Sequence, residues 1–318
     1  MGLLPAVAAL AYPFFLKGFH GEISSDNVAL AAFLLIGAFA MPLSGLWFAF
    51  RLRADQRDPK PRRLAFASIA APPLFVFLGV APGLAGIHIP DITIWVAAWL
   101  AAALYVWFVP DGPVVQTPTR PIAGWRVAHG VAAALIACFV LFHLTNHLFG
   151  LEGPGTHKAI MAVGRKVYRA PFIEPVLIGL LLFQIASGVR LAWRWSSLKV
   201  DAYRIFQVGS GAYLAMFLLA HVNSALVSAR AVHHIETDWA WASGAPTGLI
   251  HDAWNIRLLP HYALGAFFIL GHLASGLRVV MIAHGVNATI ANRFWIAALA
   301  AAALISAAII AGLCGVRI

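Results

Sequence analysis

Long apolar segments make up most of the chain, and they limit its fold more than any other feature. Nine segments can be counted, and most of them exceed the ~20 residues that a membrane-spanning helix needs. They lack the alternating pattern of barrel strands, so we expect an all-α integral membrane protein with about nine transmembrane helices. A content of 61% hydrophobic and 11% charged residues excludes an ordinary soluble domain. The expected segments are 3–16, 28–50, 65–87, 92–109, 126–150, 172–194, 206–231, 258–283 and 293–315.

Basic residues outnumber acidic ones by 22 to 12, which gives a formal net charge of +10. In a soluble protein this excess would suggest a nucleic-acid partner, but in membrane proteins Lys and Arg gather in cytoplasmic loops. The stretch 51–63, RLRADQRDPKPRR, holds six of them and is expected to be cytoplasmic. Alternation from this loop puts the N-terminus inside and the C-terminus outside, in a membrane of the bacterial inner type. We therefore expect contact with lipid and no nucleic-acid partner.

A proline-rich stretch, residues 111–125, is predicted to be a cytoplasmic loop that divides the chain. Before it, residues 1–110 are predicted to form an N-terminal region of four transmembrane helices, with no histidine in their apolar parts. After it, residues 126–285 are predicted to form a four-helix bundle, and residues 286–318 a last transmembrane helix. The histidines in apolar segments all belong to the predicted bundle.

These histidines need an explanation, because ionisable side chains are costly in hydrocarbon and face the bundle interior when they occur there. His143 and His147 share one face of a long apolar helix, with His129 about four turns below. His221 and His272 lie in two later apolar segments. Imidazoles from separate helices are the ligands that a haem b takes inside a helix bundle. We therefore predict a haem b site among the histidines.

The heights of these side chains can be estimated from the helical rise. Counted from the inner ends of their segments, His143 lies roughly 25 Å up and His221 roughly 22 Å up, so these two are expected to meet. Gln184 and His272 both lie roughly 15 Å up. The sequence therefore predicts an outer level with two histidines and an inner level with one histidine and one glutamine.

An internal repeat supports the inner level. QIASGVRLAW, which starts at Gln184, matches HLASGLRVVM, which starts at His272, so glutamine stands in one copy where histidine stands in the other. Arg190 and Arg278 follow the Ser-Gly pairs of the repeat and are candidate partners for haem propionates near the inner surface. On the outer side this role is expected of Arg165, Lys166 and Arg169.

The segment HLASGLR, from His272 to Arg278, resembles the H-x-x-x-G-I-R segment around the haem ligand in the membrane anchor of succinate dehydrogenases. Residues 125–285 also resemble the dihaem cytochrome b anchors of the succinate dehydrogenase and fumarate reductase superfamily. The resemblance implies that His143 and His221 are the ligands of the distal haem. It further implies that His272 is one ligand of the proximal haem, with Gln184 in the place of the other.

Three arrangements are therefore open. The first is one haem b, held by His143 and His221. The second adds another haem at His272, and the third is a single haem between His221 and His272. His147 is the alternative to His143, because it lies one turn away on the same face. His129, His261 and His284 are expected to be water-accessible at helix ends and to hold no cofactor.

The predicted function is that of a membrane cytochrome b in a respiratory chain. It would pass electrons between a redox partner subunit and a quinone, as an electron-transfer subunit rather than a stand-alone enzyme, so no catalytic residue is assigned. The metal ligands would be His143, His221 and His272. The two cysteines, Cys138 and Cys314, form no disulfide or haem-attachment motif. The alternatives are a haem-free membrane scaffold within a larger complex and, third, a transporter.

Overall fold

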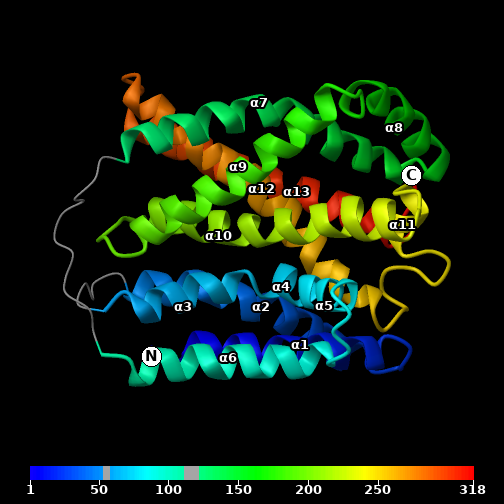
Figure 1. The fold of residues 1–318 in the computed structure, drawn as a ribbon, viewed down its shortest axis with the longest axis horizontal. Helices are drawn as coiled ribbons and strands as arrows, with labels where there is room; N and C mark the ends of the chain where they lie inside the picture. The colour runs from blue at the N-terminus through cyan, green and yellow to red at the C-terminus, as the bar shows by residue number, and fades with distance from the viewer. Residues whose placement is uncertain (53–57, 111–121) are drawn as a thin grey trace.

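The computed structural model describes residues 1–52, 58–110 and 122–318, and all the regular secondary structure in these ranges is helical (Figure 1). This confirms the expected all-α class. Most of the proline-rich stretch 111–125 lies outside the described residues. The helices are α1 (Leu4–Glu22), α2 (Val28–Arg51), α3 (Lys60–Ile69), α4 (Ala71–Leu78), α5 (Ala81–Leu84), α6 (Asp91–Phe108), α7 (Ala123–Leu148), α8 (Pro154–Tyr168), α9 (Ile173–Trp195), α10 (Ala202–Val222), α11 (Trp239–Ser243), α12 (Leu258–Ala283) and α13 (Ala288–Leu313), with 3-10 turns η2 (Phe149–Leu151) and η4 (Asn255–Arg257) and a π-helical continuation of α10, η3 (Asn223–Val232).

Seven of these helices are long and apolar enough to cross a membrane: α2, α6, α7, α9, α10, α12 and α13. An eighth span arises if α3 is combined with α4 and α5, which follow it after a bend of 67° at the adjacent prolines Pro72 and Pro73. Within the most apolar window of each span only 11% to 28% of the residues are buried, so the apolar surface faces outward. Outward apolar surface of this extent needs lipid around it. The protein is an integral membrane protein. By helix length and apolar composition, however, fewer of the described helices qualify as membrane spans than the nine predicted.

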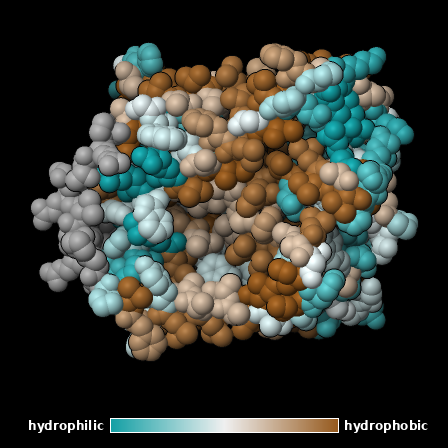
Figure 2. Space-filling view, in the orientation of Figure 1, coloured by the Kyte–Doolittle hydropathy of each residue, from teal (hydrophilic) through white to brown (hydrophobic). Residues whose placement is uncertain are grey.

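The long helices run side by side, and the two chain termini lie at opposite ends of the bundle (Figure 1). We call the end that holds the N-terminus the N-terminal end, and the other the C-terminal end. The short helices α8 and α11 lie at the C-terminal end. Figure 2 shows apolar side chains across the middle of this face and hydrophilic ones toward both ends, as a membrane protein requires.

Aromatic side chains hold the leading helices together. Tyr12 of α1, Phe75 of α4 and Trp95 of α6 are fully buried and in mutual contact, with Trp95 and Trp99 5.6 Å apart between ring centroids. The Trp95 indole also donates a hydrogen bond to the carbonyl of Ala9 (3.2 Å). A second apolar core joins α2 and α3 to α10 and α12. The leading helices are thus a packed support for two of the histidine-bearing helices.

The other two helices of the histidine bundle are packed less closely. On α9 the single buried residue is Ser187, and on α7 the buried residues are Ala132, Ile136, Val140 and Asn146. Helices α7 and α9 pack on each other and α9 packs on α10, whereas α7 touches α12 only sparsely. Space therefore remains between α7 and the helices opposite it.

Substitution of Gly45 tests whether α2 and α3 cross as closely as the structure shows. A Cβ atom at Gly45 would lie 2.6 Å from the carbonyl oxygen of Ala65, a backbone atom that cannot move aside. We expect Gly45→Ala to lower the free energy of unfolding by about 1–3 kcal/mol through overpacking. Detergent-denaturation curves would measure the change. In the control Gly179→Ala the new methyl group meets nothing within 4 Å, so an equal loss there would contradict this packing.

Candidate functional site

A cavity of about 240 Å³ opens between α7, α8, α9, α10 and α12 toward the C-terminal end of the bundle. Four histidines face it, from three helices: His143 and His147 from α7, His157 from α8 and His221 from α10. The remainder of the lining is mainly apolar, for example Leu177, Leu181, Phe217 and Ile269. Ionisable rings therefore meet inside an environment with few polar groups.

His143 of α7 and His221 of α10 both line this cavity and lie close to each other. Their ring centroids are 6.1 Å apart and the ring planes are inclined by 70°. Phe139 stacks on His143 and Phe217 stacks on His221, each from one helical turn earlier on the same helix. Neither imidazole makes a hydrogen bond to any other residue that the structure describes. The two rings are thus held in orientation while their nitrogen atoms stay available.

This geometry fits a metal centre with two axial imidazoles. Two rings on opposite sides of one metal, with metal–nitrogen bonds of roughly 2 Å each and the ring radii added, have centroids about 6 Å apart. Among the described residues no group of three or more His, Cys, Asp or Glu side chains is arranged to hold a bare metal ion. A haem supplies its own four equatorial nitrogens, so two imidazoles are enough for it. The cavity volume of about 240 Å³ is below the range of ligand pockets, about 300–1,000 Å³. A macrocycle therefore needs side chains at the margin of the cavity to move, and the few buried residues of α7 and α9 allow this.

His147 and His157 form a second layer beside His143. The His147 ring lies 4.7 Å from that of His143 and 5.2 Å from that of His157, between centroids. The side-chain amide of Asn146 lies 3.1 Å from Nε2 of His157 and donates to it. His147 has no ring contact with His221 in the described structure. Of the two candidates on this face of α7, the geometry therefore favours His143 as the ligand.

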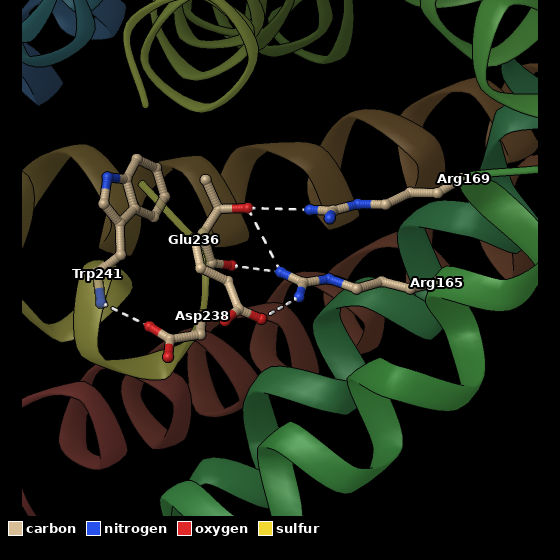
Figure 3. A network of polar contacts seen from close by, with 6 residues as sticks. Arg165, Arg169, Glu236, Asp238 and Trp241 are labelled. Carbon is tan, nitrogen blue, oxygen red and sulfur yellow. Dashed lines mark hydrogen bonds and ion pairs between the residues drawn. The ribbon is translucent and has the colours of Figure 1, made fainter. Parts of the chain in front are cut away.

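Two arginines of the cavity lining, Arg165 and Arg169, belong to a network of polar contacts with the segment 236–241 (Figure 3). Arg165 donates to the carboxylate of Glu236 (2.8 Å) and to the carbonyl of Thr237 (2.9 Å), and Arg169 donates to the Thr237 hydroxyl (3.1 Å). Arg230 pairs with Glu174 at 2.5 Å. All three arginines line the cavity. The loop that follows η3 is thereby fastened over the site, beside cations that suit carboxylate groups.

The inner level differs from its prediction. His272 does not meet Gln184; its ring lies instead beside that of His129, at 6.3 Å between centroids and 80° between planes. Gln184 donates from Nε2 to the backbone carbonyl of His129 (2.8 Å). The proposed contact between His221 and His272 is likewise not observed among the described residues. His129 was expected at a water-accessible helix end, and its side chain is half-buried beside His272 and Ser187.

A sequence signal for His129 existed. His129 and His143 are fourteen residues apart, which at 100° per residue is about 40° short of four full turns, so both rings leave the same face of α7. His261 was also misjudged, since its side chain is 1% exposed and packs against Phe217 at 4.6 Å. His261 therefore lies deeper in the bundle than the predicted segment end suggested.

The remaining predicted residues lie at the N-terminal end, away from the cavity. Arg190 stacks over Trp125, with its guanidinium carbon 4.6 Å from the ring centroid. Arg278 stacks over Tyr203 (3.7 Å) and donates to the side-chain oxygen of Asn292 (2.7 Å). Of the predicted propionate partners, Arg165 and Arg169 line the cavity, whereas Arg190 and Arg278 lie at the opposite end of the bundle.

The geometry thus defines a membrane-embedded pair of neighbouring imidazoles in an apolar cavity with basic residues at its border. Comparison of the chain with models of known protein families, with curated proteins and with solved structures finds no match.

The pH dependence of stability should report on His157, which lies in α8, outside the candidate spans. Burial, and next the Arg165 guanidinium, lower the pKa of His157 to about 4, while the Asp238 carboxylate acts in the opposite direction. An unfolded chain binds this proton near pH 6.5. Between about pH 6.5 and 4 the unfolded state therefore holds more protons, and acidification destabilises the folded state.

We expect the denaturation midpoint to fall as the pH is lowered from 7 to 4.5, and His157→Gln to reduce this fall. The control His284→Gln, which changes an exposed histidine, should retain the dependence of the unchanged protein. Equal pH profiles for the unchanged protein and His157→Gln would contradict the burial of a neutral imidazole at this position.

Proposed function

We propose that the protein is a membrane cytochrome b whose outer cavity holds a haem b between His143 and His221. The observation that supports this most is the close approach of the two rings in the cavity, 6.1 Å apart between centroids. When bound, a bis-histidine haem has no open position on its iron and exchanges one electron at a time, which suits electron transfer rather than oxygen chemistry.

The side chains around the cavity have distinct tasks in this function. Phe139 and Phe217 fix the planes of the two imidazoles by stacking. The apolar lining excludes water and keeps the local dielectric low, which strengthens any charge interaction at the border. Arg165 and Arg169 neutralise carboxylate groups that reach that border. The loop between η3 and α11 closes the cavity through the hydrogen bonds of these arginines.

The electron partners follow from the resemblance to succinate dehydrogenase and fumarate reductase anchors. The protein acts as an electron-transfer subunit of a membrane complex, between a redox partner subunit and a quinone. Its place is the bacterial inner membrane, with the N-terminal end in the cytoplasm, where the basic residues around α3 belong.

Nine crossings suit this orientation. Termini at opposite ends of the bundle require an odd number of crossings (Figure 1). If the bent pair that begins with α3 is an eighth span, α1 supplies the ninth. Helix α1 has 19 residues and is therefore about 28 Å long, close to the thickness of the hydrocarbon core.

A reduced-minus-oxidised visible spectrum of the purified protein tests the proposal. We expect the α-band of a low-spin b haem. A colourless protein, after expression with haem available, would contradict the proposal and would leave a haem-free scaffold or a transporter as the function.

Substitutions should identify the ligands of the outer haem. His143→Ala and His221→Ala are each expected to remove the haem of the outer cavity completely, because one imidazole is lost and the bond to iron with it. His147→Ala is the matched control, one turn away on the same helix face, and should retain that haem. Haem content per chain, together with the difference spectrum, measures all three. Loss of haem in His147→Ala with retention in His143→Ala would reverse the assignment on α7.

A further inference from the structure

A second pair of histidines lies nearer the N-terminal end of the bundle. His129 of α7 and His272 of α12 are 6.3 Å apart between ring centroids, with the planes at 80°. The outer pair has nearly the same separation and inclination. Since α7 contributes one ring to each pair, fourteen residues apart, the two levels are separated by about 21 Å along that helix.

Serine hydroxyls form hydrogen bonds with Nδ1 of both inner rings. Nδ1 of His129 lies 2.7 Å from the hydroxyl of Ser187, and Nδ1 of His272 lies 3.0 Å from that of Ser210. A serine hydroxyl has a single proton to donate. Ser187 donates it to the carbonyl of Phe183 (2.6 Å) and Ser210 to that of Gln207 (3.2 Å). With the hydroxyl proton donated to the carbonyl, each serine accepts from the imidazole; in that tautomer Nδ1 carries the proton and Nε2 has its lone pair free for a metal.

Gln184 holds His129 in place rather than competing for the same site. Its side-chain amide donates to the backbone carbonyl of His129 and ties α9 to α7 at that residue. Ser187, one helical turn further along α9, then meets the ring of His129. The glutamine thus acts as a positioning residue for the histidine on the neighbouring helix.

Glycines stand where the edges of the two rings need space. A Cβ atom at Gly188 would lie 3.5 Å from Cε1 of His129, and a Cβ atom at Gly211 would lie 3.2 Å from Cε1 of His272. At Gly276, one turn from His272, a Cβ atom would meet nothing within 4 Å. Larger side chains at these positions would crowd a planar group between the helices.

Arginines gather just beyond the inner pair. Arg126 lies one turn before His129 on α7, and Arg204 and Arg278 come from α10 and α12. Both Arg126 and Arg278 are close enough to Arg204 to interact with it electrostatically, and Asp201 is the acidic residue that acts on this group. Three cations with one nearby carboxylate provide partners for the carboxylates of a bound group.

From these observations we infer that His129 and His272 are the axial ligands of a second haem b, at the inner level. The inference rests on the proposed function, because it assigns a second copy of the same cofactor. In this assignment α7 supplies one ligand to each haem. The second ligand comes from α10 at the outer site and from α12 at the inner site. Arg126, Arg204 and Arg278 bind the propionates of the inner haem.

Haem stoichiometry tests this assignment. The unchanged protein should contain two haems per chain, and His129→Ala and His272→Ala should each contain one, with the outer haem retained. His284→Ala, at the exposed end of α12, is the control and should keep two. His272→Met is a sharper variant, because a thioether ligand raises the reduction potential of a haem. It should keep two haems and raise the midpoint potential of one of them in a redox titration.

The serine contacts give an independent measurement in variants that leave both histidines in place. Ser187→Ala and Ser210→Ala remove the acceptor of an Nδ1 proton and so make the imidazole a weaker donor to iron. Each should raise the midpoint potential of the inner haem alone. One haem per chain, unchanged by His129→Ala and His272→Ala, would overturn the inner site and leave the proposed function intact. Unaltered potentials in both serine variants would also overturn it, and a protein without haem would overturn both proposals.

Discussion

Neutral imidazole rings inside an apolar bundle impose the constraint on which this structure depends. Each ring has one nitrogen that donates and one that accepts, and water cannot serve either within the spans. At the inner level the serines on α9 and α10 satisfy Nδ1, whereas His143 and His221 reach no hydrogen-bonding partner among the described residues and face a cavity. The helices that carry these rings have to lie next to one another, and the loops, the short helix α8 and the basic residues are arranged around them.

The two halves of the protein support this arrangement differently. The leading helices bury large aromatic side chains and continue into a core with α10 and α12, so His221 and His272 stand on a firmly packed surface. Helix α9 packs on α10, whereas α7 buries few residues and touches α12 only sparsely, and the cavity lies beside α7. A site between a rigid wall and a loosely packed pair of helices can admit a large planar group without breaking the main core. The first four segments, which carry no histidine in their apolar parts, are therefore part of the scaffold of the site.

Sequence reasoning reached the helical membrane class and the meeting of His143 with His221, because the rise per residue fixes the height of a side chain on a straight span. It failed for His261, which was expected at a water-accessible helix end but is 1% exposed, because that end of α12 is packed against Phe217 of α10. It failed for Gln184 for another reason. The repeat relates positions along α9 and α12, but it carries no information on which helix lies across from each position. Glutamine and histidine stand at equivalent places in the repeat and face different neighbours, and only packing in three dimensions decides between them.

The placement of two rings on one face of α7 has a consequence for how this helix can vary. Insertion or deletion of a single residue between His129 and His143 would turn one imidazole by about 100° relative to the other and move it by about 1.5 Å along the axis. One of the two histidine pairs would then be lost, whatever residue was added. The spacing of fourteen residues from His129 to His143 is thus fixed, although six of the thirteen residues between them are exposed and free to change. Substitution is tolerated there, but a change of register is not.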